Sequence, residues 1–431
     1  MLSTASGFQS LLKEGFRHYA GLEEAIIRNI EACKGISDKT KTSIGPNGMK
    51  KIVVNHIDKL FITSDAATML REIEVHHPAA KMIVMAAKMQ EIECGDMTNF
   101  VITFAGELLS QAQELIKLGL HPSDIVLGYE IASKKALDIL MSLNHYQVAD
   151  PRSYEQVIPT VETALCPKMP GYYRHFAKLI TEACIKILPE DNVLNTDYIR
   201  IVRIIGGGLV DSHVVNGMVV ERPPMGTITS VENPKIACYN CPFEINGGET
   251  KGTVLIKNAE DLLNFSSSEE GLMERYIKSI ADQGVQVCVV GGSVSELAMH
   301  YLEKYEIMVI RIMSKYDLMR ICRCLGATVI SQLGQPSQED LGYCKKIYQK
   351  EIGSEKVTIF EKDEINIKLQ TIVLRGPTKA ILEDVTRSIG HGINTYRTLL
   401  KHNVFIHGAG ASESVIFILL STSPTCWRVK P

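Results

Sequence analysis

The hydrophobic pattern of the chain changes twice, and this constrains the fold more than any other feature. Residues 1–150 have the periodicity of amphipathic helices, as in GLEEAIIRNIEACKG. From about residue 209, strand patterns such as VQVCVVGG, EIMVIRIM, KVTIFEK and LQTIVLRG alternate with helical ones such as SELAMHYLEKY. Helical periodicity returns after Pro377. We therefore predict an α/β domain inserted into a helical one, with hinges at the glycines 206–208 and at Gly376.

Short signals mark the ends of the predicted helices. The helix AAKMIVMAAKMQEIEC stops at Gly95, and the next begins at once, with Thr98 able to cap its first turn. After Pro122, the residues Ser123 and Asp124 are suited to the start of another helix. The first helix has one apolar face, formed by Leu22, Ile26, Ile30 and Cys33.

Composition and charge disfavour several classes of protein. The formal net charge is -3, so no broad basic surface for nucleic acid is expected. No apolar run reaches the roughly 18 residues of a membrane span, and the N-terminus lacks the pattern of a secretory signal. The eleven cysteines are scattered, which indicates reduced thiols rather than a disulfide framework. We expect a cytoplasmic protein without nucleic-acid or membrane partners.

One CxxC pair, Cys238 and Cys241, occurs in ACYNCPF. A structural zinc site would need a second pair at suitable spacing, and the sequence offers none. A redox motif would open a helix, whereas Pro242 follows here at the end of a predicted strand. The pair is therefore interpreted as two ordinary thiols.

Two glycine-rich turns are candidates for phosphate binding. In TSIGPNGMKKIVV, the turn Gly45–Gly48 precedes two lysines, and turn amides of this kind form anion nests. It is not a Walker A loop, and a plain turn is the alternative. HGAGASES, at 407–414, is a second glycine-rich turn before an apolar run, in which Glu413 stands in the first turn of the expected helix.

Two aspartates stand beside predicted helix starts. Asp65, in FITSDAATML, lies between a strand pattern and a helix, where a carboxylate commonly serves only as a cap. Asp96, in CGDMTNF, lies between the end of one helix and the start of the next. Helix N-termini attract phosphate, and Mg²⁺ is often held by one carboxylate beside it.

These stretches, in this order around an inserted α/β domain, resemble those of group II chaperonins, the TCP-1/CCT/TRiC family. The resemblance runs to about residue 413 and includes GFQSLLKEGFRHYAGLEEAIIRNIEACK, GPNGMKKIVVNHIDKLF, HHPAAKMIVMAAKMQE, TKGTVLIKNAEDLLNFS and LQTIVLRGPT. It implies a multidomain fold. A mostly helical equatorial ATPase domain would cover 1–147 and 402–431. A small α/β intermediate hinge domain would cover 148–207 and 376–401, and an inserted α/β apical substrate-binding domain 208–375.

The resemblance also implies a site for ATP and Mg²⁺. Asp96 takes the role of metal ligand, and Asp65 and His391 stand at catalytic positions. Lys168, in TALCPKMPG, matches a lysine that a loop brings near the nucleotide. The other nucleotide-binding positions implied are Gly45, Pro46, Asn47, Gly48, Met97, Thr98, Asn99, Gly408 and Gly410.

Three departures from the family pattern bear on activity. Met97 replaces the second glycine of GDGT, where a positive φ would strain methionine by about 1–2 kcal/mol. His391 replaces the aspartate that orients the attacking water, and loss of a positioned base costs about 10²–10⁴-fold in rate. Ala409 replaces the middle glycine of GGG, a milder change. After Glu413 the tail SVIFILLSTSPTCWRVKP differs from the family, so we expect the C-terminal part of the equatorial domain to be missing.

The function implied is that of an ATP-dependent chaperone subunit in a hetero-oligomeric cytosolic double ring, which binds unfolded client proteins beside other chaperonin subunits. Clients of this family bind an apical helix, matched here by YDLMRICRCLG, and the stretch NFSSSEEGLMERY would begin the lid. The alternative is that the apolar face of this helix packs on a sheet. The predicted client-binding residues are Leu318, Ile321, Cys322 and Leu325.

Two other functions stay open. A truncated, non-hydrolysing form that binds clients or interferes with ring assembly is favoured by Met97, His391 and the unusual tail. A dinucleotide-dependent enzyme would use VVGGSVSE as its phosphate-binding turn, but this stretch lacks the GxGxxG pattern.

Overall fold

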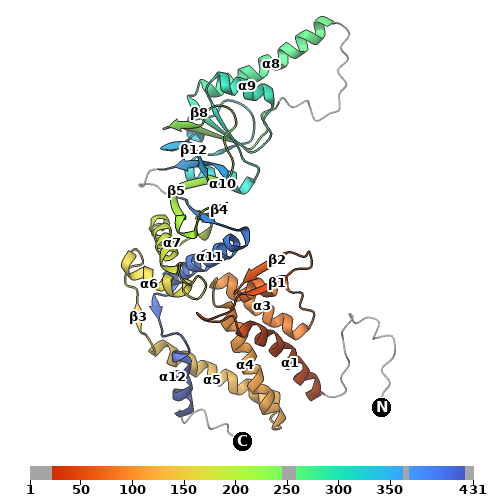
Figure 1. The fold of residues 1–431 in the computed structure, drawn as a ribbon, viewed down its shortest axis with the longest axis vertical. Coiled ribbons are helices and arrows are strands. Elements are labelled where there is room, and N and C mark those ends of the chain that lie inside the picture. The colour runs from red at the N-terminus through yellow and green to blue at the C-terminus, as the bar shows by residue number, and fades with distance from the viewer. Residues whose placement is uncertain (1–21, 245–258, 363–367, 423–431) are drawn as a thin grey trace, which may run out of the picture. The chain divides into compact units, whose positions relative to one another are not determined.

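A computed structural model of the chain describes residues 22–244, 259–362 and 368–422. The chain forms two compact units, one of residues 1–148 and 403–431 and the other of residues 149–402 (Figure 1). The second unit is thus inserted into the first along the sequence. Residues 1–21 and 423–431, including Trp427, lie outside the described part.

The first unit is mostly helical, as the sequence predicts. Two small antiparallel sheets accompany the helices, one pairing β1 with β2 and the other pairing β3 with β15. The helices are α1 (Leu22–Lys41), α2 (Ala66–Glu72), α3 (Pro78–Glu93), α4 (Thr98–Lys117), α5 (Pro122–Ser142) and α12 (Ala411–Thr422). The strands are β1 (Lys51–Val54), β2 (Leu60–Thr63), β3 (Tyr146–Gln147) and β15 (Val404–Phe405).

The core of this unit lies where α1, α3 and α4 pack together around α2. Ile102 and Ala66 are fully buried there, and Cys33 is nearly so. The axes of α1 and α4 approach closely at Gly106, where a Cβ would lie 2.2 Å from Oγ of Ser37. A glycine in the middle of α4 is therefore required by packing rather than by flexibility.

The second unit joins a helical layer to two sheets. Its helices α6 (Tyr154–Leu165), α7 (Tyr173–Ile187) and α11 (Lys379–Lys401) pack on one another, and α11 also contacts β4 and β14. The first sheet has the order β4-β14-β5-β13-β12-β6, in which only β4 and β14 are parallel. Its strands are β4 (Ile199–Ile205), β5 (His213–Val220), β6 (Ser230–Glu232), β12 (Lys346–Ile352), β13 (Glu355–Glu361) and β14 (Gln370–Gly376).

The second sheet has the parallel order β10-β7-β8-β9, with β11 antiparallel to β7. Its strands alternate with helices, as the sequence predicts, and its central strands are buried. The strands are β7 (Lys235–Tyr239), β8 (Val285–Val290), β9 (Met308–Arg311), β10 (Val329–Ile330) and β11 (Gly342–Tyr343). The helices are α8 (Ala259–Ala281), α9 (Glu296–Lys304) and α10 (Lys315–Leu325), and the short 3₁₀ turns of this unit are η2 (Thr196–Tyr198), η3 (Leu209–Asp211) and η4 (Gln338–Asp340).

The two glycine segments expected to be hinges lie side by side in the second unit. The amide of Gly206 donates to the carbonyl oxygen of Gly376 over 2.9 Å. Strands β4 and β14 pair along seven residues that end at Ile205 and Gly376. The six-stranded sheet therefore crosses the boundary predicted between the intermediate and apical domains, and the three-domain division itself stays a prediction.

One local prediction needs correction. Thr98 does not cap α4, because the N-cap is Met97 and Thr98 is already helical. Ser123 and Asp124 stand in the first turn of α5, as predicted, and His121 caps this helix through its Nδ1, which accepts from the amide of Ser123. The glycines of VVGGSVSE have a packing reason, since a Cβ at Gly292 would lie 2.7 Å from Pro242.

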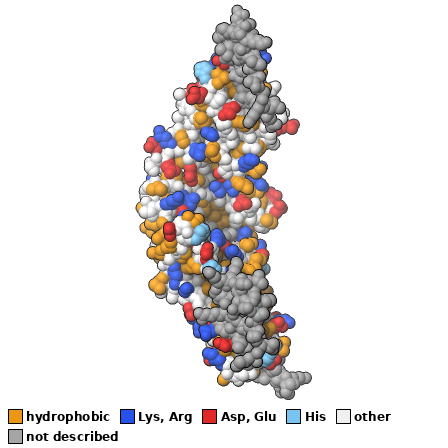
Figure 2. Space-filling model, turned by 90° about the vertical axis from the view of Figure 1, so that its right-hand side faces the viewer, with side chains coloured by type: hydrophobic (Ala, Val, Ile, Leu, Met, Phe, Trp, Pro, Cys, Tyr) orange, Lys and Arg blue, Asp and Glu red, His pale blue; other side chains and the backbone are white. Residues whose placement is uncertain are grey.

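The surface mixes charges of both signs. On the face drawn in Figure 2, Lys and Arg side chains lie among Asp and Glu side chains over the described residues. Among the helices that the structure describes, none is long and apolar enough to cross a membrane.

Candidate nucleotide-binding site

The turn after α1 has the geometry of a tight, glycine-dependent loop. The amide of Gly48 donates to the carbonyl of Gly45, and the amide of Met49 donates to that of Thr42, each over 3.0 Å. Gly45 has a φ of +82°, and a Cβ at Gly48 would lie 2.5 Å from the carbonyl oxygen of Ser43. Both glycines are therefore required. Pro46 and Asn47 are exposed at the tip of the turn.

Asp65 is the N-cap of α2, so it has the capping role that a carboxylate commonly has at a helix start. Its carboxylate accepts from the amides of Ala67 and Thr68 and, over 2.6 Å, from Oγ1 of Thr68. Oγ1 of Thr98 also donates to it over 2.8 Å. Asp65 is buried, so these donors replace the water that a carboxylate needs. A catalytic role for this residue stays a prediction.

Asn99 joins three segments that are distant in the sequence. Its Nδ2 donates to Oγ of Ser43 over 2.9 Å and to the carbonyl of Ser64 over 2.8 Å. Its Oδ1 accepts from the amide of Ala66 over 2.7 Å. The side chain therefore fixes the glycine turn, the start of α2 and the start of α4 in one arrangement.

The side chains of Thr98 and Asn99 use their donors inside the protein. Thr98 is buried and donates to Asp65, and both amide hydrogens of Asn99 are engaged. The expectation that these side chains face phosphate therefore needs correction, because their hydrogen-bond donors are already engaged within the protein. A contact with phosphate at this position would be made through the backbone amides that begin α4.

Met97 has the strained conformation expected from its replacement of a glycine. Its φ is +65° and its ψ is +21°, in the left-handed region, and its side chain is 57% exposed. The amide of Met97 donates to Oδ1 of Asp96 over 2.7 Å, and Nε2 of Gln90 donates to the Asp96 carbonyl over 3.1 Å. Asp96 is thus held by its neighbours at the junction of α3 and α4.

The second glycine turn leads directly into α12. Gly410 has a φ of +84° and Ala409 a φ of +57°. The replacement of a glycine by Ala409 is therefore less mild than the sequence suggests, because alanine is strained in this region. Apart from the adjoining residues, no atom of the described chain lies within 4 Å of the Cβ position at Gly408 or Gly410, so these residues leave the backbone open to a ligand.

Lys168 and His391 belong to the second unit. Lys168 lies in the turn after α6, where its amide donates to the carbonyl of Leu165. His391 is buried within α11, and its carbonyl accepts from Oγ1 of Thr395. Their expected approach to the nucleotide stays a prediction.

The residues present fit ATP and Mg²⁺. Gly45, Gly408 and Gly410 have open space at their Cβ positions, which would let phosphate approach the backbone. The described residues hold no group of three His, Cys, Asp or Glu able to bind a metal. A single carboxylate such as Asp96 suits Mg²⁺, which completes its shell with phosphate oxygens and water.

The four predicted client-binding residues lie in the core. Leu318, Ile321, Cys322 and Leu325 on α10 are at most 4% exposed and pack on the second sheet, as the alternative interpretation holds. Their proposed contact with clients therefore needs correction, because a client cannot reach them in this structure. The opposite face of α10 presents Tyr316 and Met319, which are 73% and 63% exposed.

The CxxC pair consists of free thiols, as predicted. Cys238 is buried on β7, where a hydrogen bond with Cys322 and burial raise the pKa of its thiol. Burial also raises the pKa of Cys241. Raised pKa values disfavour the thiolate, which is the nucleophilic form of each sulfur.

Ser43 is the site residue that sequence reasoning missed. Its hydroxyl donates to the carbonyl of Thr40 over 2.6 Å and accepts from Asn99. Ser43 and Asn99 are 56 residues apart, and no local pattern links them.

Comparison with known proteins identifies the family. The TCP-1/cpn60 chaperonin family matches residues 36–423, which extends past residue 413, where the resemblance was expected to end. T-complex protein 1 subunit theta of Bos taurus is 48% identical over 409 residues, covering 95% of this chain and 75% of that protein. The protein of the same name from Homo sapiens is 47% identical with the same coverage. That of Arabidopsis thaliana is 46% identical over 410 residues, covering 94% of this chain and 75% of that protein. The chain belongs to the TCP-1/cpn60 chaperonin family.

Proposed function

We propose that the protein is an ATP-dependent chaperone subunit of a hetero-oligomeric cytosolic chaperonin ring. The family membership and the shared name of the relatives, T-complex protein 1 subunit theta, support a place beside other subunits in such a ring. The observation that carries ATP binding is the bonded group of Ser43, Asp65, Thr98 and Asn99, which holds a glycine turn and two helix starts together.

Each residue of this site has a defined part in the proposal. The backbone of Gly45–Gly48 and of the 408–410 turn would cradle phosphates, and Asp96 would hold Mg²⁺. When bound, Mg²⁺ would neutralise part of the negative charge on the phosphates. His391 would orient the attacking water and accept its proton, less effectively than a fixed carboxylate.

Client binding is proposed for the exposed face of α10. Tyr316 and Met319 offer apolar area to unfolded segments. A pocket of about 510 Å³ lies beside the start of this helix, and its lining includes Arg200, Arg203, Arg222 and Asp317. A surface with both apolar and charged groups suits unfolded chains of mixed composition.

Nucleotide binding tests this proposal directly. We expect the chain to bind ATP in the presence of Mg²⁺, and Asp96→Ala to remove the Mg²⁺-dependent part of the affinity. Asp138→Ala, an exposed residue on α5, is the matched control and should leave binding unchanged. A chain that folds but binds no ATP would contradict the proposal.

A subunit that binds ATP and clients without turnover is the second candidate. The observation in its favour is that α11 holds the buried His391 at the position where the resemblance implies an aspartate that orients the attacking water. Equal, measurable hydrolysis by the unaltered chain and by His391→Asp would exclude it. A rate that is detectable only in His391→Asp, at unchanged ATP affinity, would establish it.

A further inference from the structure

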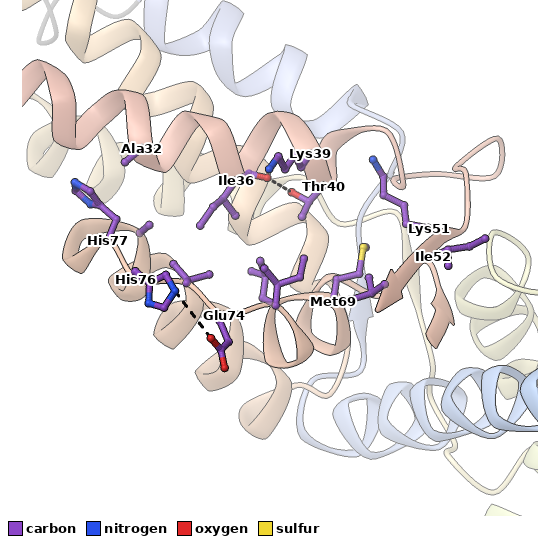
Figure 3. Close-up of a pocket in the computed structure, with 15 residues that line it drawn as sticks. Ala32, Ile36, Lys39, Thr40, Lys51, Ile52, Met69, Glu74, His76 and His77 are labelled. Atoms are coloured by element: carbon purple, nitrogen blue, oxygen red, sulfur yellow. Dashed lines mark hydrogen bonds and ion pairs between the residues drawn. The ribbon is translucent and has the colours of Figure 1, made fainter. Parts of the chain in front are cut away.

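A pocket of about 430 Å³ lies in the first unit, apart from the residues of the nucleotide site (Figure 3). It is lined by α1, β1, the end of α2, the segment that leads into α3 and the first turn of α3, and it is open to solvent on one side. Pockets of this size hold small organic ligands. Its floor consists of the buried residues Val53, Met69, Leu70 and Ala80.

The rim of the pocket is basic. Lys39 and Lys51 line it and form no ion pair with any described residue. The one acidic group in the lining, Glu74, faces Nε2 of His76 at 3.9 Å. Two lysines therefore remain uncompensated above an apolar floor.

A histidine adds a second polar feature. Nδ1 of His77 is buried and has no hydrogen-bond partner within the described part of the chain. Figure 3 shows His76 and His77 toward one end of the pocket and Lys51 toward the other, with Ile36 and Met69 between them. The pocket thus has apolar side chains in its middle, with Lys39 and Thr40 beside them and further polar groups at its ends.

We propose that this pocket binds a small carboxylic acid with an apolar body, such as a medium-chain fatty acid. Burial of the hydrocarbon on the floor would supply affinity, and Lys39 and Lys51 would select the carboxylate by charge-assisted hydrogen bonds. A neutral ligand of the same shape would leave both lysines without a partner. The pocket adjoins the nucleotide turn through Thr40 and Lys51 but shares no residue with the group of Ser43, Asp65, Thr98 and Asn99, so the proposal does not rest on the proposed chaperone function.

Calorimetric titration of the full chain with octanoate tests the proposal. We expect one octanoate per chain, and binding of octanol weaker by about tenfold, since it lacks the charge. Replacing both lysines, as Lys39→Met with Lys51→Met, should weaken octanoate binding by about tenfold and leave octanol binding unchanged. Lys134→Met, an exposed lysine on α5, is the matched control and should change neither.

A second variant locates the ligand. Ala32 lines the pocket and is half-buried, so Ala32→Leu should fill it and abolish octanoate binding. Unchanged binding to Ala32→Leu, or equal affinity for octanol and octanoate, would overturn the proposal. Equal affinity for N-acetyl-leucine would overturn the assignment to a fatty acid and point to the carboxyl end of a polypeptide.

Discussion

Backbone conformation at single residues separates this chain from the family pattern. Met97 and Ala409 both stand in the left-handed region where the family has glycine. The sequence predicts the strain at Met97 from the GDGT comparison, provided that the family glycine is there for its positive φ. It does not predict the strain at Ala409, since one small residue replaces another.

Met97→Gly is expected to stabilise the protein by about 1 kcal/mol, because relief of left-handed strain exceeds the entropic cost of glycine. Urea denaturation measures the change. Lys135→Gly in α5 is the control, and we expect it to destabilise by about 0.5–1 kcal/mol as glycine does inside a helix. If Met97→Gly lowers the free energy of unfolding, the Met97 side chain stabilises the folded protein by more than its left-handed backbone costs.

Asn99→Ala is expected to destabilise the first unit by about 2–4 kcal/mol, because it removes the acceptor of the Ala66 amide and the side-chain donor to the Ser64 carbonyl and to the Ser43 hydroxyl. It should also weaken ATP binding through loss of the turn geometry. Ser43→Ala removes one of these bonds and should have a smaller effect on both. Equal effects of the two variants would contradict the joining role of Asn99.

At the scale of elements, α1 and α4 depend on a close approach. Gly106→Ala would place a methyl group against Ser37, so we expect destabilisation of about 1–3 kcal/mol. Gly128→Ala in α5 is the matched control, because nothing lies within 4 Å of its Cβ position, and it should stabilise by up to about 1 kcal/mol. Ser37→Gly should partly rescue Gly106→Ala. No rescue would mean that the clash is elsewhere.

Two buried thiols in and beside the second sheet are expected to make the folded protein less stable at alkaline pH. Burial raises the pKa of Cys288 and of Cys344 to about 12. Below pH 9 both thiols are protonated whether the chain is folded or not, so their contribution is fully present. From pH 9 toward 12 only the unfolded thiols ionise, and each costs up to about 1.4 kcal/mol per pH unit. Denaturation midpoints between pH 8 and 11 measure this, and Cys288→Ala should reduce the slope.

Element positions were predictable where periodicity is strong. The helices α1, α3 and α11 and the strands β8, β9, β13 and β14 stand where the sequence places them. Caps were not, because methionine and histidine are not among the residues that usually stand at N-caps, and Met97 makes no side-chain cap bond. The buried face of α10 also has an apolar pattern that suits a client site and a core equally, and only the structure separates the two.

For the whole molecule, the insertion of one unit into another follows from the sequence pattern. The division of the second unit into two domains does not follow from the sequence. Strands β4 and β14 pair across the boundary, near residue 208, that the change in hydrophobic pattern suggests. The nucleotide site shows the same limit. Its glycines and aspartates stand out locally, whereas the bond between Ser43 and Asn99 links residues that only the fold brings together.

The native size of the chain in cell lysate, measured by sedimentation with ATP present, tests the central claim most directly. A ring subunit should sediment with the large chaperonin particle. Asn99→Ala should shift toward smaller species if the nucleotide-site geometry supports assembly. Sedimentation of the unaltered, soluble chain only as a small species would contradict its proposed place in the ring.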